Sequence, residues 1–145
     1  MHAGCSIAAN LAAPWGCMVA DVNHRFISTP VFALQSIFDT NQLSSDNKCK
    51  TSACALPYMR YLNQSVIGFA SAPGRATGAY VDMCSRHCNS GPIMIEGYSS
   101  LGAFAEWFRG IHVAGSGATS FRRLWMQRSP LPFNKKAPYC TDCCH

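Results

Sequence analysis

Nine cysteines constrain this chain more than any other feature of its sequence. In 145 residues, that number is typical of proteins that fold in an oxidising compartment, where disulfides persist. We therefore expect disulfide bonds and an extracellular or secretory location. The odd count leaves one thiol unpaired or bonded to a cysteine outside the chain. The disulfide candidates are Cys5, Cys17, Cys49, Cys54, Cys84, Cys88, Cys140, Cys143 and Cys144.

Three further features bear on location. The sequence Asn63-Gln64-Ser65 fits an acceptor site for N-glycosylation, which agrees with secretion. The first residues, "MHAGCSIAANLAAPW", lack the basic start and long apolar run of an export signal. No apolar run of about 18 residues is present, so we expect no membrane span. A secreted composition without an export signal predicts that the chain lacks the N-terminal part of its protein.

The charge of the chain argues against one class of partner. Only 13% of the residues are charged, and the net charge of +5 is not gathered in a dense basic run. Proteins that bind nucleic acids usually cluster basic residues on one face or along one helix. We therefore expect no nucleic-acid partner. Apolar residues make up 48% of the chain, which is enough to form a packed core.

Two segments have the pattern of buried strands. Residues 26–38 begin with a turn that ends at Pro30, and the apolar run that follows predicts a strand covered on both faces. Residues 78–83, "GAYVDM", predict a second short strand. The polar stretch between Asp39 and Cys54, "DTNQLSSDNKCKTSAC", predicts a loop.

Two other segments have the spacing of helices. Residues 56–70 carry apolar side chains at helical intervals, and Pro57 suits the first turn. Residues 99–109 predict another helix, which either Ser99 or Ser100 can cap. Strands that alternate with helices favour a parallel sheet with flanking helices, an α/β fold. Two strands do not form such a sheet alone.

One acidic residue and one histidine follow the two predicted strands. Asp39 comes directly after the first strand and His87 follows the second. Open α/β sheets place their sites at the carboxyl ends of strands. In α/β-hydrolases the catalytic triad runs Ser, Asp or Glu, then His along the chain, and Asp39 and His87 have that order. His87 would then be the general base and Asp39 would orient its ring.

Four segments carry a resemblance to a known family. The sequences "ISTPVFALQSIFDTNQL", "YVDMCSRHCN", "FAEWFRG" and "PYCTDCCH" resemble the C-terminal part of the pectin acetylesterase/Notum family. Members of that family are secreted carboxylesterases with an α/β-hydrolase fold. The resemblance implies that residues 1–145 are the C-terminal portion of a single, incomplete α/β-hydrolase domain.

The resemblance also assigns roles to residues. By motif position, Asp39 corresponds to the acid of the family's triad and His87 to its base. The implied reaction is removal of an acyl group from an acylated polysaccharide, such as acetylated pectin, or from an acylated protein. No metal ion and no organic cofactor is implied.

The nucleophile of such a triad is not identified. Ser6 lies in "GCSIA", which approximates the Gly-x-Ser-x-Gly elbow of the fold. However, only three residues precede Gly4, too few for the strand that an elbow follows, and Ala8 replaces the second glycine. We therefore expect Ser6 not to be the nucleophile. The chain would then be a fragment, a truncated gene product or a degenerate copy of an esterase, and whether it is itself an enzyme stays open.

Two other classes of protein remain open. A non-catalytic, disulfide-stapled secreted module could use Trp107 and Trp125 as a binding face. A zinc-binding domain could draw its ligands from the cysteines, although structural zinc sites usually space paired ligands by about two to four residues. Only part of the chain fits that spacing: Cys84, His87 and Cys88, and the C-terminal group Cys140, Cys143, Cys144 and His145.

Overall fold

The structure of the chain is a computed structural model, and it describes Cys5, Cys17 and residues 20–46, 48–49, 51–72, 76–84, 87, 93–113 and 122–127. By its internal contacts the chain divides into two compact units, Met1–Pro30 and Val31–His145. Each unit is described by itself below.

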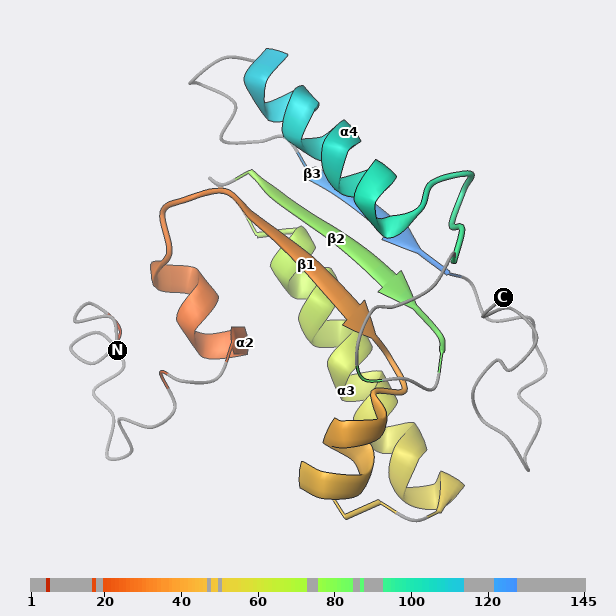
Figure 1. Cartoon of the computed structure of the whole chain (residues 1–145). Helices are drawn as coiled ribbons and strands as arrows, with labels where there is room; N and C mark the ends of the chain where they lie inside the picture. Colours follow the sequence, from red (N-terminus) through yellow and green to blue (C-terminus); the bar gives the residue numbers. More distant parts are fainter. Residues whose placement is uncertain are drawn as a thin grey trace. The chain divides into compact units, whose positions relative to one another are not determined.

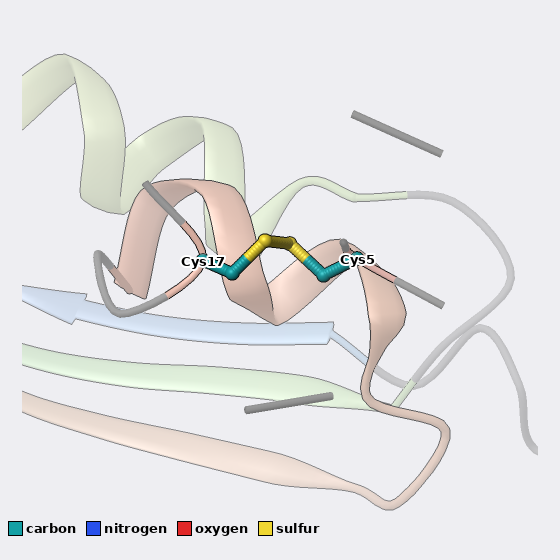
Figure 2. Close-up of a disulfide and its surroundings, with 2 residues drawn as sticks. All are labelled: Cys5 and Cys17. Atoms are coloured by element: carbon teal, nitrogen blue, oxygen red, sulfur yellow. A yellow bond between two sulfur atoms is a disulfide. The ribbon is translucent and has the colours of Figure 1, made fainter. Parts of the chain in front are cut away.

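The described residues of the first unit include one short helix and one disulfide. Helix α2 (Ala20–Asn23) leads into the 3-10 turn η2 (His24–Phe26), and the Nδ1 atom of His24 lies 3.0 Å from the carbonyl oxygen of Ala20. The disulfide joins Cys5 to Cys17, 12 residues further along the chain (Figure 2). Both cysteines are buried.

A parallel sheet organises the second unit. Its strands are β1 (Val31–Ser36), β2 (Thr77–Asp82) and β3 (Arg122–Met126), in the order β1-β2-β3. The three arrows in Figure 1 point the same way, as expected for parallel pairing. The predicted parallel α/β arrangement is therefore confirmed. The third strand was not predicted from the sequence, and it supplies the additional strand that a sheet of this kind requires.

One helix covers each face of the sheet. Helix α3 (Ser52–Ala70) packs on one face and helix α4 (Ser100–Val113) on the other (Figure 1). Successive side chains of a strand point to opposite faces, and β2 follows this rule. Ala79 and Val81 belong to the core cluster that includes residues of α3, whereas Tyr80 belongs to the cluster that includes Trp107 of α4. Every residue of β2 is buried, as expected for a central strand between two helical layers.

Trp107 and Trp125, which a binding module could have used as a binding face, lie inside the core. Trp107 is 3% exposed and Trp125 is fully buried, and both belong to the cluster beneath α4. Phe32 of β1 packs between them, with ring centroids 5.2 Å from Trp107 and 6.0 Å from Trp125. Neither indole ring is available as a binding face, so the hypothesis that these two residues bind a ligand is wrong.

Close packing between α4 and the sheet depends on Gly78. A Cβ atom at this position would lie 2.6 Å from Cδ2 of Phe32 and 2.7 Å from Cδ1 of Trp107. Atoms of real side chains essentially never approach that closely, so any larger residue would force the helix and sheet apart. Glycine in β2 is therefore what allows the indole of Trp107 to lie directly on the strand.

The structure corrects the prediction of a loop between the first strand and α3. Residues Gln42–Asp46 form a π-helical turn, η3, and α3 begins at Ser52 rather than near residue 56. The helix starts early because the carbonyl oxygen of Thr51 accepts hydrogen bonds from the backbone of Cys54 and Ala55, at 3.1 and 3.0 Å. Pro57 consequently lies inside the helix, not in its first turn.

At the start of α4, the structure selects one of the two possible caps. The Oγ atom of Ser99 accepts a hydrogen bond of 3.1 Å from the backbone nitrogen of Gly102. Ser100 is the first residue of the helix itself. A serine in the position before a helix commonly satisfies a free backbone N–H in this way.

Strand β1 is less buried than its apolar sequence predicts. It lies at one side of the described sheet, and four of its six residues are only half-buried. Leu34 is 49% exposed. Both faces of this strand are covered only in part, with Ala33 packed against the cluster that includes α3 and Phe32 against the cluster beneath α4, because the two helices pack mainly over β2 and β3.

Candidate active site

Asp39 and His87 meet because β1 and β2 end at the same level. Ser36 and Asp82, the last residues of the two strands, are partners in the register of the sheet. The backbone nitrogen of Ile37 then donates to the carbonyl oxygen of Asp82 at 2.9 Å, so pairing continues one residue beyond β1. The segments that follow both strands consequently leave the sheet at the same edge.

A tight turn after β1 places the Asp39 carboxylate. The backbone nitrogen of Asp39 donates to the carbonyl oxygen of Ser36 at 3.2 Å. Its Oδ1 atom accepts hydrogen bonds from the backbone nitrogens of Asn41 and Gln42, both at 2.9 Å. Asp39 therefore caps the helical turn that leads into η3. These two donors fix the position of the carboxylate.

His87 completes the pair. Its Nδ1 atom lies 3.0 Å from Oδ1 and 3.1 Å from Oδ2 of Asp39. A carboxylate accepts hydrogen bonds, so this contact favours the tautomer that carries its proton on Nδ1 and leaves the Nε2 lone pair free. The Asp39 side chain is 7% exposed and that of His87 is 55% exposed. The pair therefore joins a buried carboxylate to an imidazole ring that is partly open to solvent.

A second set of contacts supports the acid from α3. Oε1 of Gln42 accepts a hydrogen bond of 2.7 Å from the hydroxyl group of Tyr58, and Nε2 of Gln35 lies 3.5 Å from the same oxygen. Gln42 is also one of the two residues whose backbone donates to Asp39. Tyr58 thus links the helix to the turn that holds the carboxylate. The sequence did not indicate this link, because Gln42 and Tyr58 lie 16 residues apart.

Asp82 is a second buried acid at this edge. It is fully buried, and its Oδ1 atom accepts a hydrogen bond of 2.9 Å from the backbone nitrogen of Cys84. The sequence placed Asp82 within a strand and gave it no role. In the structure it orders the start of the segment that carries His87.

Five of the nine cysteines lie among the described residues, and all five are in disulfides. The bonds Cys5–Cys17 and Cys49–Cys54 join cysteines within single units, and Cys84 is disulfide-bonded as well. A bonded sulfur cannot act as a thiolate ligand, so these residues do not support a zinc site. Cys88, Cys140, Cys143 and Cys144 lie outside the described residues.

The structure describes some of the remaining predicted site residues but not all of them. Ser6 lies outside the described residues, so its relation to His87 is untested. Asn63 lies in α3 and is half-buried, and its glycosylation stays a prediction. Within the described part of the chain, no three His, Cys, Asp or Glu residues gather as metal ligands. No helix there has both the length and the apolar character needed to cross a membrane.

Comparisons with known proteins identify no relative. No protein-family model matches the chain, and neither the curated proteins nor the solved structures contain a match. The functional assignment therefore depends on the geometry of the site and on the sequence resemblance described above.

Proposed function

We propose that the chain is the Asp- and His-bearing part of a carboxylic ester hydrolase with an α/β-hydrolase fold, of the pectin acetylesterase/Notum type. The observation that carries the proposal is the contact of 3.0 to 3.1 Å between His87 Nδ1 and the Asp39 carboxylate. A pair of this geometry, located beyond the carboxyl ends of adjacent parallel strands, matches the acid and base positions of a hydrolase triad.

The proposed chemistry gives each residue one task. Nε2 of His87 takes the proton from a serine hydroxyl group as its oxygen attacks the ester carbonyl, and it later returns that proton to the departing alcohol. A water molecule then releases the acyl group by the same route. Asp39 holds the imidazole in the required tautomer and stabilises the imidazolium that forms. The serine belongs to this proposal as a third group, and Ser6 is not assigned to that role.

The proposed substrates follow from the resemblance. They are acylated polysaccharides, such as acetylated pectin, or acylated proteins. The disulfides of the described residues are compatible with an extracellular or secretory location, where such substrates occur. The exposure of His87 supports a base that a large substrate can approach.

A chimera tests the proposal directly. The chain would replace the corresponding C-terminal segment of an active pectin acetylesterase, and release of acetate from acetylated pectin would be measured. Activity is expected with the wild-type segment and should fall by about six orders of magnitude with His87→Ala, as when a triad base is lost. A matched His24→Ala control should remain active. Equal activity in the His87→Ala and wild-type chimeras would contradict the proposal.

The chain by itself answers a separate question. Hydrolysis of p-nitrophenyl acetate should be the same for wild type and Ser6→Ala if Ser6 is not the nucleophile. If wild type turns over and both Ser6→Ala and His87→Ala are inactive, Ser6 completes the triad and our expectation for it is wrong.

A further inference from the structure

The segment that carries His87 is attached to the sheet by a side chain from β3. The backbone nitrogen of Gln127, the residue after β3, donates to the carbonyl oxygen of Val81 at 2.9 Å. The side chain of the same residue reaches further, and its Oε1 atom accepts a hydrogen bond of 2.9 Å from the backbone nitrogen of Met83. Gln127 therefore holds the chain on both sides of Asp82.

This second bond replaces a missing backbone bond of the sheet. In a regular parallel ladder, the backbone nitrogen of Met83 would next bond to the backbone carbonyl oxygen of Gln127. Here the side-chain carbonyl of Gln127 accepts that bond instead. The strand thus ends at Asp82, but the backbone of the next residue, Met83, stays attached to Gln127.

Asp82 extends the same attachment by another residue. Its Oδ1 atom accepts a hydrogen bond of 2.9 Å from the backbone nitrogen of Cys84. Cys84 directly follows Met83, whose backbone nitrogen donates to Gln127. Met83 and Cys84 are both buried. The side chains of Gln127 and Asp82 therefore accept hydrogen bonds from two successive backbone nitrogens beyond the end of β2. The second of these belongs to Cys84, three residues before His87.

We infer that Gln127 is a positioning residue that sets where the His87 imidazole lies relative to Asp39. The inference rests on the proposed function, because it concerns the base of the same site. Gln127 does not touch a reactant. It acts through Met83 and the segment that follows. Catalytic groups need to be held within about 0.5 Å of their productive position, which gives such an attachment a functional consequence.

The test uses two variants of similar size that differ in one property. Gln127→Leu fills nearly the same volume but cannot accept the bond from Met83, whereas Gln127→Glu keeps an acceptor at the same distance along the side chain. Gln64→Leu on the exposed surface of α3 is the matched control. If Gln127→Leu does not fold, Gln127→Asn replaces it, because its shorter side chain cannot reach Met83.

The readout is the tautomer of His87, measured in the full 145-residue chain by long-range nitrogen–proton NMR of the imidazole ring. We expect the Nδ1–H form to dominate in wild type, Gln127→Glu and Gln64→Leu. In Gln127→Leu or Gln127→Asn we expect it to give way to the Nε2–H form that free imidazole side chains prefer. A purely structural role would lower stability without changing the tautomer of the folded protein.

The outcomes separate this inference from the proposed function. If wild type shows the Nδ1–H form and Gln127→Leu keeps it, Gln127 does not position His87, and the proposed Asp39–His87 pair stands. If wild type itself shows the Nε2–H form, both the pair and the inference are overturned. If the tautomer responds as expected while the acetylesterase chimera is inactive, Gln127 positions His87 but the proposed esterase function is wrong.

Discussion

His87 Nδ1 lies 3.0 Å from Asp39 Oδ1, the same oxygen atom that accepts hydrogen bonds from the backbone nitrogens of Asn41 and Gln42. One carboxylate therefore caps a helical turn and orients a histidine at the same time. The two tasks make different demands, because the cap needs only an acceptor oxygen, whereas the histidine needs a carboxylate that accepts from Nδ1–H. Substitutions at Asp39 should separate them.

Asp39→Asn and Asp39→Ala should differ in stability. Asparagine keeps an oxygen for the cap, and we expect a small change in the free energy of unfolding. Alanine loses the cap, which should lower the free energy of unfolding by about 1 kcal/mol. Both variants should lose the Nδ1–H tautomer of His87. Urea denaturation and NMR of the imidazole check the two effects, and equal stability of both variants would argue against the cap.

Gly78→Ala should destabilise the chain by about 1 to 3 kcal/mol, because the added methyl group overlaps Phe32 and the indole of Trp107. The measurement is the free energy of unfolding from urea denaturation, with Trp fluorescence as the probe. Gly68→Ala is the matched control, since nothing lies within 4 Å of its added methyl group and the residue is within α3. That variant should gain up to about 1 kcal/mol. A tolerated Gly78→Ala would show that α4 does not pack as closely as described.

Tyr80→Phe should lower the free energy of unfolding by about 1 to 3 kcal/mol. The hydroxyl group of Tyr80 is buried, lies 2.6 Å from the carbonyl oxygen of Ile93 and 3.2 Å from that of Tyr98, and its removal leaves these acceptors without this donor. Tyr98→Phe is the control, because the described residues show no hydrogen bond of its hydroxyl group. Similar losses in the two variants would assign the effect to packing.

The disulfide between Cys49 and Cys54 joins residues on either side of the start of α3. Replacing both with serine should cost about 2 kcal/mol, the chain-entropy value for a loop that closes over five residues. Peptide mapping after alkylation without reductant should find Cys5, Cys17, Cys49, Cys54 and Cys84 protected. Free thiols at these positions, together with stoichiometric zinc, would favour the zinc-binding alternative.

The sequence predicted those parts of the fold that have strong local signals. Strands at 31–36 and 77–82 and helices at 52–70 and 100–113 correspond to the predicted segments, with shifted ends. Strand β3, "RRLWM", was missed because it is short and starts with two arginines. Its place is set by pairing with β2 and by burial of Trp125, which depend on residues far away along the chain.

The site shows the same division. The contact between Asp39 and His87 could be predicted because each residue follows a strand, and neighbouring parallel strands end at the same edge of a sheet. Gln127 could not be predicted, because its bond to Met83 exists only once an unpredicted strand has paired. The contact between Tyr58 and Gln42 likewise depends on how α3 packs.

The order of the strands also has a consequence for how the chain acquires its fold during synthesis. Val31 pairs with Thr77, and Thr77 in turn pairs with Arg122, so each ladder joins parts of the chain that are made far apart in time. Pairings of this kind form slowly because a long loop must close before any contact is gained. Strand β1 therefore leaves the ribosome without a partner strand, and it stays unpaired until α3 and β2 have been synthesised. The Asp39–His87 pair accordingly cannot form before β2 and residue 87 have been made, and protection from aggregation matters most in that interval.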